Sequence, residues 1–359
     1  MPIAPGARPL EELDGMEWSG PEEMGEQIAA LADEGDEARA GAYEFFYSQL
    51  LRPGSGAAAA QAAPFLIGLA ADAAVPQRAH LLELLDAFSA VVAPGSPLSE
   101  KLAAGAATYA SMLEDEDAEV RLQATQLVSR WPGAREEAAA SLRALAERDD
   151  DERVRANALL AMTSLGAPDH ALAEAAFRAG PERALERLAG AVSLVSELKG
   201  EAPADVFEHL LAAATGDPDA LEQAEALPSL GDPWGTSAAA LVRAPQPLRE
   251  RAIQALVESY DRKPWATDEQ SAGLLQAALG GKVSAEALAS LSPLQKEAVR
   301  AVAERAADSG GVAMSIQVVM RELGLPTGAA ELAALLGRPA PAASASEAPA
   351  GRKPWWKLW

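Results

Sequence analysis

The sequence contains no cysteine, and this absence excludes disulfide bonds, cysteine–zinc sites and thiol catalysis together. Aromatic residues make up only 5% of the chain, and residues that favour strands never cluster into alternating runs. The three histidines, at positions 80, 170 and 209, lie far apart, so we expect no metal site. No run of about eighteen apolar residues occurs, so no membrane-spanning helix is predicted.

Positive charge is also scarce, because 30 basic residues face 53 acidic ones and leave a net charge of −23. A surface this acidic repels phosphate backbones, so we expect no nucleic-acid partner. High negative charge more often keeps a protein soluble than marks a binding site. No signal peptide is apparent in the first residues, and together with the lack of cysteine this predicts a cytoplasmic protein.

Sequence signatures of catalysis are missing as well. The chain has neither a Gly-x-Ser-x-Gly nucleophile elbow nor a His-Glu-x-x-His zinc motif. The stretch 280–284 resembles a phosphate-binding loop only at its end, since the first glycine and the preceding strand are absent. We therefore predict a protein that is not an enzyme and that uses no cofactor.

The composition that remains favours helices, because alanine, leucine, glutamate and arginine are strong helix formers. One short pattern occurs twice at an interval of 34 residues: an aspartate, then Val-Arg after three residues, then an alanine seven residues after the aspartate. The two copies comprise Asp117, Val120, Arg121, Ala124, Asp151, Val154, Arg155 and Ala158. Self-similarity at this period predicts an array of helical repeats.

Each residue type in this pattern has a structural role. An aspartate at a helix start caps free N–H groups and meets the positive end of the helix dipole. The valine and alanine belong to one apolar stripe, and the small alanine lets the paired helix approach closely. The arginine beside the stripe is predicted to reach an acidic turn of the next repeat. Stacked repeats would then form a ladder of charge-assisted hydrogen bonds.

The pattern Asp-x-x-Val-Arg-x-x-Ala resembles the second-helix signature of HEAT repeats, most closely over residues 117–127 and 151–160. The layout of residues 20–337 is similar to that of bacterial HEAT-repeat proteins of the PBS-lyase-HEAT-like kind. This resemblance implies an all-α fold, a right-handed, armadillo-like α-solenoid of about eight antiparallel helix pairs. It also implies that the protein holds other proteins. At position 186 a glutamate replaces the arginine of the pattern.

Composition divides the chain into four parts. Residues 1–20 are punctuated by proline and glycine and are predicted to be a poorly ordered extension. The helical repeats are predicted to fill residues 21–337. Residues 338–351 contain mainly proline, alanine and serine and are typical of a linker. Residues 352–359 form a terminal peptide rich in tryptophan and lysine, so the chain is predicted to end in a disordered tail.

The apolar stripes also sort buried side chains from exposed ones. In the helix that ends near residue 52, the spacing predicts that Tyr43, Phe46, Tyr47 and Leu50 are buried. On the second helices of the two strong copies, polar side chains outside the stripe are candidates for binding a partner. These candidates are Gln123, Gln126, Arg130 and Asn157.

The last eight residues carry three tryptophans beside basic residues, and the candidate binding residues here are Trp355, Trp356, Lys357 and Trp359. Three interpretations stay open. The peptide folds back onto the acidic repeats through charge and cation–π contacts. Alternatively, a groove of a partner protein binds it, with the tryptophans as anchors. In the third interpretation it touches a membrane interface, where tryptophan and lysine favour the headgroup region.

We predict a monomeric, non-catalytic scaffold that binds another protein through the solenoid surface, with the terminal peptide as a docking motif. Two alternatives differ in class. One is an accessory subunit or enzyme whose site forms across several repeats. The other is an adaptor that is recruited to a membrane, and in that case the membrane contact comes only from the tail.

Overall fold

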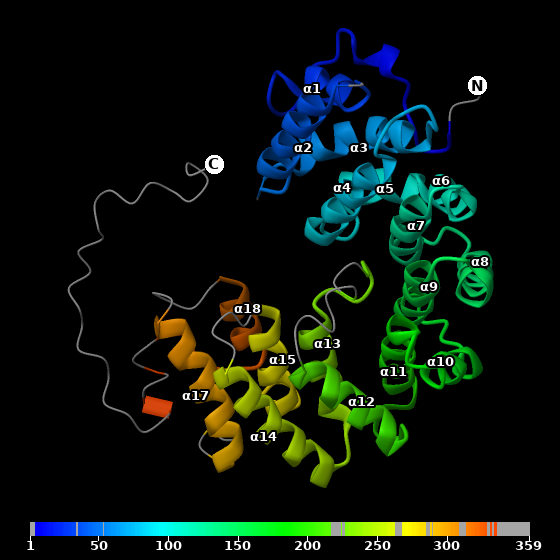
Figure 1. Cartoon of the computed structure of the whole chain (residues 1–359). Coiled ribbons are helices and arrows are strands. Elements are labelled where there is room, and N and C mark those ends of the chain that lie inside the picture. The colour runs from blue at the N-terminus through cyan, green and yellow to red at the C-terminus, as the bar shows by residue number, and fades with distance from the viewer. Residues whose placement is uncertain are drawn as a thin grey trace. The chain divides into compact units, whose positions relative to one another are not determined.

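The structure is a computed structural model of the chain, and it describes residues 4–33, 35–52, 54–216, 224, 227–262, 268–284, 288, 290–308, 314–328, 331, 334 and 335. Every regular element in these ranges is a helix, and none of the described residues lies in a strand (Figure 1). The fold is therefore all-α, as the composition predicts. The chain divides into two compact units, residues 1–233 and 234–359.

Unit 1 consists of helices that follow one another with short connections. Their bounds are α1 Met24–Leu31, α2 Asp36–Leu50, α3 Gly56–Ala71, α4 Arg78–Val91, α5 Pro97–Ala104, α6 Ala106–Ser111, α7 Ala118–Arg130, α8 Arg135–Arg148, α9 Glu152–Leu165, α10 His170–Phe177, α11 Ala184–Leu198 and α12 Ala204–Thr215. Short 3-10 helices occupy Leu10–Leu13, Met112–Glu114 and Lys199–Glu201. The two strong copies of the sequence pattern coincide with the starts of α7 and α9.

The helices of unit 1 lie in two rows. Helices α2, α4, α7, α9 and α11 pack one against the next, and we call them the second-helix row. Helices α1, α3, α6, α8 and α10 lie beside them as their partners. Figure 1 shows the two rows most clearly from α6 to α11. Helix pairs that each contact the next pair are the arrangement expected of a helical repeat protein.

The core of unit 1 lies between these rows and is built from the apolar stripes. Val120, Ala124, Val154 and Ala158 are completely buried. Burial of a valine side chain contributes about 1.5–3 kcal/mol relative to exposure. The alanines leave room for close helix contacts, so the four side chains position α7 and α9 within the stack.

Capping residues define where α7 and α9 begin. Asp117 Oδ1 accepts a hydrogen bond from the Glu119 N–H at 2.9 Å, and Asp151 Oδ1 accepts one from the Arg153 N–H at 2.7 Å. At the other end of α9, Gly166 adopts a left-handed conformation with φ of +72°, which glycine tolerates because it has no Cβ. The caps thus place the arginines of both helices at equivalent positions, one turn after each helix start.

The described part of the N-terminal extension runs across α3 and reaches α6. The Arg8 N–H donates to the Pro64 carbonyl at 2.9 Å, and Thr108 Oγ1 donates to the Pro5 carbonyl at 2.8 Å. A Cβ on Gly68 would lie 2.8 Å from the Arg8 carbonyl oxygen, so the crossing requires a glycine there. Residues 4–20 are consequently held by α3 and α6.

Unit 2 contains α13 Pro233–Ala240, α14 Gln246–Arg262, α15 Asp268–Leu279, α17 Pro293–Asp308 and α18 Met314–Glu322. Helix α15 packs against α14, α17 and α18. The Arg249 guanidinium donates to the Ala277 carbonyl at 3.1 Å, and Gln295 Nε2 donates to the Ala278 carbonyl at 3.0 Å. Both side chains therefore satisfy carbonyls at the C-terminal end of α15 that have no partner within the helix.

Candidate functional site

Successive helices of the second-helix row are joined by arginine–aspartate pairs. In each pair, an arginine near the start of one helix binds an aspartate just before the next helix of the row. Arg78 on α4 donates to both carboxylate oxygens of Asp115, at 2.7 and 2.9 Å. Arg121 on α7 donates in the same way to Asp149, at 2.8 and 2.9 Å. The Asp149 side chain is only 4% exposed. Bidentate pairs of this kind combine strength with a fixed geometry, so they set the spacing of successive repeats.

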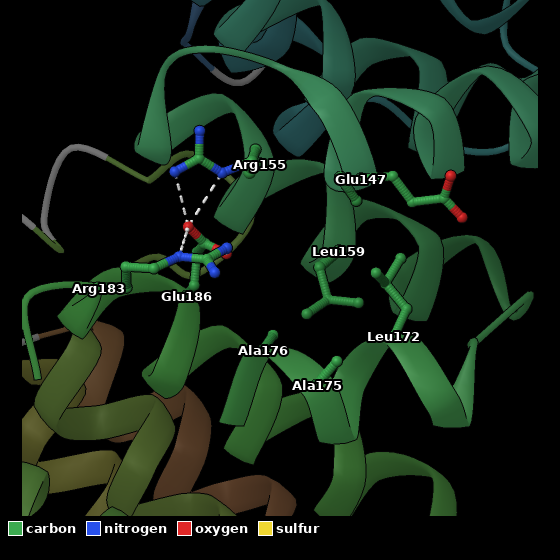
Figure 2. Close-up of a pocket in the computed structure, with 9 residues that line it drawn as sticks. Glu147, Arg155, Leu159, Leu172, Ala175, Ala176, Arg183 and Glu186 are labelled. Atoms are coloured by element: carbon green, nitrogen blue, oxygen red, sulfur yellow. Dashed lines mark hydrogen bonds and ion pairs between the residues drawn. The ribbon is translucent and has the colours of Figure 1, made fainter. Parts of the chain in front are cut away.

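The third pair has a different acceptor. Arg155 on α9 donates through Nε and Nη2 to Glu186 Oε1, at 3.0 and 2.8 Å. Arg183 also donates to the same carboxylate, and Figure 2 shows both guanidinium groups converging on it. Glu186 stands where the sequence pattern expects an arginine, and its side chain accepts the bonds from the preceding repeat. We call the three pairs, Arg78–Asp115, Arg121–Asp149 and Arg155–Glu186, the arginine ladder.

A cavity of about 220 Å³ lies beside the last step of the ladder (Figure 2). It is lined by Ala146, Glu147, Arg155, Leu159, Leu172, Ala175, Ala176, Arg183 and Glu186. Arg155 uses its remaining nitrogen, Nη1, on the carbonyl oxygens of Asp149 and Asp150. Because the Arg155 donors already have partners and Glu186 balances its charge, we assign this cavity a structural role.

The four polar side chains that the sequence predicts as partner-binding candidates lie on α7 and α9 of the second-helix row. Asn157 on α9 is completely buried. Its Nδ2 donates to Thr125 Oγ1, and its Oδ1 accepts from the Ser229 N–H at 2.8 Å. Leu227 is fully buried and Leu230 is 5% exposed, so the segment around Ser229 is anchored on both sides. Asn157 therefore binds a segment of its own chain that lies 72 residues away.

Gln126 extends this contact toward α4. Oriented so that both ends of its amide are satisfied, it donates to Ser229 Oγ at 2.7 Å and accepts from Arg130 Nη2 at 3.1 Å. Arg130 in turn forms an ion pair with Asp86, with Nε 2.9 Å from Oδ1. A continuous polar chain thus runs from Ser229 on the loop through Gln126 and Arg130 on α7 to Asp86 on α4.

Gln123 makes the second bridge to α4, because its Nε2 donates to Glu83 Oε1 at 3.2 Å. Of the four candidate residues on these helices, Gln123, Gln126 and Asn157 are at most 8% exposed. The Arg130 side chain is 36% exposed. In this structure the first three serve contacts within the chain, and only Arg130 presents a substantial surface to a partner.

Tyr47 on α2 shows a surface that the sequence interpretation missed. Phe46 and Leu50 are buried, as the spacing predicts, but Tyr47 is 41% exposed, so the prediction that it is buried was wrong. The cause is its position one turn after Tyr43, on a stripe that neighbours the buried one. The sequence did contain a signal that Tyr47 faces a polar surface. Glu83 and Asp86 lie on the polar side of α4, the next helix of the second-helix row.

Tyr47 lies on the same side of the row as Glu83 and Asp86, because α2 packs against α4. Burial raises the pKa of Glu83 and that of Asp86, although the positive charge of Arg130 opposes the shift at Asp86. Burial also raises the pKa of Tyr47, and the charges of Glu83 and Asp86 raise it further. Beside them the rings of Tyr43 and His80 meet edge to face, with centroids 5.7 Å apart. We call the surface of Tyr47, Glu83 and Asp86 the acidic aromatic patch.

Three further predictions from the sequence concern the terminal peptide, metal binding and membrane-spanning helices. Trp355, Trp356, Lys357 and Trp359 lie outside the described residues. Within the described ranges no group of three or more histidine, aspartate or glutamate side chains is arranged to hold a metal ion. The helices that the structure describes include none with the length and apolar character needed to cross a bilayer.

Comparisons with known proteins add little to this description. No family model matches the chain, and no curated protein does. A solved structure described as that of an engineered protein is similar at 17% identity over 92% of this chain and 96% of that chain. Its TM-score of 0.24 is too low to support an argument about the fold. The class is therefore defined by the coordinates themselves: an all-helical protein compatible with a helical repeat architecture.

Proposed function

We propose that this protein is a non-catalytic, cytoplasmic scaffold that binds another protein along its second-helix row. We further propose that its helices form a right-handed, HEAT-like solenoid of about eight antiparallel pairs. Support for the repeat assignment comes from the arginine ladder, in which two bidentate arginine–aspartate pairs recur with the sequence pattern. Solenoids of this kind present extended binding surfaces, because each repeat adds one helix to the same face.

The observation that carries the functional proposal is the exposed part of the second-helix row. Tyr47 on α2, Glu83 and Asp86 on α4 and Arg130 on α7 combine an exposed ring with charged groups on consecutive repeats. Exposed aromatic residues beside polar groups are typical of binding surfaces. The terminal peptide 352–359 is a second docking element in this proposal, with its tryptophans as anchors.

Site-specific photo-crosslinking tests the proposal. A photoreactive phenylalanine analogue replaces Tyr47 in one variant and Glu136, an exposed residue on the partner helix α8, in a matched control. In a lysate of the source organism we expect a discrete crosslinked protein from position 47 and none from position 136. Equal yields from both positions, or none from either, would contradict binding through the second-helix row.

A chain that ends at residue 351 separates the two docking elements. If the row is the main surface, crosslinking at position 47 persists without residues 352–359. Loss of the crosslink on truncation would assign the main contact to the terminal peptide instead. Binding of the full chain, but not the truncated chain, to lipid vesicles would favour membrane recruitment over protein docking.

A further inference from the structure

The chain itself shows how the second-helix row holds an irregular segment. At Ser229 the main-chain N–H donates to the Asn157 amide oxygen, and the hydroxyl accepts from the Gln126 amide nitrogen. Neutral amides suit such a segment because they both donate and accept. The row thus binds this segment through polar side chains that project from its helices.

One helix away, the same row changes its chemistry from amides to carboxylates. Glu83 lies five residues after the ladder arginine Arg78, the position that Gln126 holds relative to Arg121, and Asp86 follows one turn later. A carboxylate accepts hydrogen bonds without donating. Among the described residues Glu83 forms no ion pair and has the Gln123 amide as its partner. Asp86 forms an ion pair with Arg130, and the Asp86 side chain remains 21% exposed. An occupant of this part must supply donors and positive charge.

Tyr47 adds a preference for a specific kind of cation. Tyr47 is 41% exposed. It lies one turn after Tyr43, whose ring contacts His80 on α4, three residues before Glu83. A guanidinium or ammonium group that lies over such a ring gains a cation–π contact while it pairs with the acids. Neutral donors such as serine hydroxyls gain nothing from the ring, so the combination favours lysine and arginine.

We propose that the acidic aromatic patch binds lysine or arginine side chains of an extended basic segment in a partner protein. This inference rests on the proposed function, because it names the chemistry of the partner for the same row. The segment would lie beside the one that Ser229 already occupies and would bring its cations to Glu83, Asp86 and Tyr47. The carboxylates of the patch thereby gain the positive partners that the chain supplies only in part.

Fluorescence anisotropy with a labelled peptide of alternating glycine and arginine tests the proposal at about 0.15 M salt, where distant charges are screened. The same peptide with neutral citrulline in place of arginine is the ligand control. The patch variant is Glu83→Gln/Asp86→Asn, and the protein control is Glu136→Gln/Glu137→Gln on α8, where both side chains are exposed. Both proteins lose two negative charges, so the overall field changes equally.

We expect the patch variant to bind the arginine peptide about tenfold more weakly than the parent and the α8 control to bind within about twofold of it. The citrulline peptide should bind neither protein. Equal weakening in both variants would overturn the proposal, because it would show attraction to overall charge. Binding of citrulline as tight as that of arginine would overturn it as well.

Two Tyr47 variants keep the test valid if the double substitution disturbs folding, since Tyr47 lies largely at the surface. Tyr47→Phe retains the ring and should bind like the parent, whereas Tyr47→Ala should weaken binding about two- to fivefold. If the parent fails to bind the arginine peptide while crosslinking at position 47 still captures a protein, this inference fails and the proposed function stands. If crosslinking also fails, both fail together.

Discussion

The guanidinium of Arg121 holds the carboxylate of Asp149, 28 residues further along the chain, in two hydrogen bonds of 2.8 and 2.9 Å. The third nitrogen of Arg121, Nη1, donates to the carbonyl oxygens of Asp115 and Glu116 before its own helix. One side chain therefore ties the start of α7 to the start of α9. This relationship gives the repeated Val-Arg pair a physical meaning: it joins neighbouring repeats and leaves the exposed face of the row available.

The Arg121–Asp149 pair should therefore matter far more than an exposed pair. We expect Arg121→Ala to lower the free energy of unfolding by about 3–5 kcal/mol, because the buried Asp149 carboxylate loses its partner. Arg121→Lys should retain only part of the stability that Arg121→Ala loses, since an ammonium group cannot form the bidentate contact. Chemical denaturation followed by circular dichroism measures both changes.

Arg148 offers the matched control, because it directly precedes Asp149 in the chain and its side chain is 80% exposed. Its contact with Glu147 is 3.8 Å long, so Arg148→Ala should change stability by about 0.5 kcal/mol at most. Similar losses for Arg121→Ala and Arg148→Ala would show that the ladder does not hold the repeats together.

The Arg78–Asp115 pair, the first of the arginine ladder, should lose its stabilising effect over a defined range of acidic pH. The Arg78 hydrogen bonds lower the pKa of Asp115. In the unfolded chain this carboxyl has a pKa of about 3.9. A lowered pKa in the folded state contributes stability above the unfolded value, and this contribution is lost as pH falls through the folded value. Arg78→Gln should thus cost stability at about pH 7 and cost progressively less below about pH 4.

Urea denaturation of the parent and Arg78→Gln across that pH range measures the difference. Arg148→Gln serves as the control, since an exposed and distant pair should show no pH-dependent difference. A penalty for Arg78→Gln that stays constant to about pH 3 would mean that Asp115 is not the group whose ionisation Arg78 stabilises.

Asn157 should be needed to hold the segment around Ser229. Asn157→Leu keeps a similar volume but leaves the Ser229 N–H without its acceptor, so we expect a loss of about 1–3 kcal/mol. Hydrogen exchange at the Ser229 amide should become faster at the same time. Ser229→Ala removes only the hydroxyl contact to Gln126 and should cost about 1 kcal/mol. Unchanged exchange in Asn157→Leu would argue against the contact.

Local signals explain which parts of this fold the sequence predicted. An aspartate cap, the Val-Arg pair and an alanine one turn later all act within one helix, so Asp117 and Asp151 mark the starts of α7 and α9 directly. The arginine ladder was predicted from the same pattern, because stacked copies bring equivalent positions together. The acceptor Glu186 was not predicted, since a glutamate at the arginine position looks like a lost repeat until the preceding arginine is seen to reach it.

Long-range contacts explain what the sequence could not predict. The spacing of Gln123, Gln126 and Arg130 places them on one face of α7, and this arrangement could be predicted from the sequence. Nothing near Asn157 indicates that Ser229 returns to it, because the contact depends on how the intervening helices stack. The exposure of Tyr47 depends in the same way on α4, which supplies the carboxylates beside it. Burial of single side chains is thus the part of the site that needs coordinates.

Close packing of α10 against α11 leads to the last prediction. A Cβ at Gly190 would lie 2.6 Å from the Ala173 carbonyl oxygen and 2.6 Å from the Phe177 nitrogen. Both neighbours are backbone atoms, so the helices must move apart to admit a methyl group. Alanine normally favours a helix interior over glycine by about 1 kcal/mol. We expect Gly190→Ala to destabilise the protein by about 1–3 kcal/mol nevertheless, because overpacking outweighs that gain.

Gly41 on α2 gives the matched comparison, because it is exposed and a Cβ there would meet no atom within 4 Å. Gly41→Ala should stabilise the protein by up to about 1 kcal/mol, since only the helix preference changes. Thermal denaturation of the two variants should therefore move the midpoint in opposite directions. If Gly190→Ala also raised the midpoint, α10 and α11 could not be packed as closely as this glycine implies, and the pairing of these two helices would need revision.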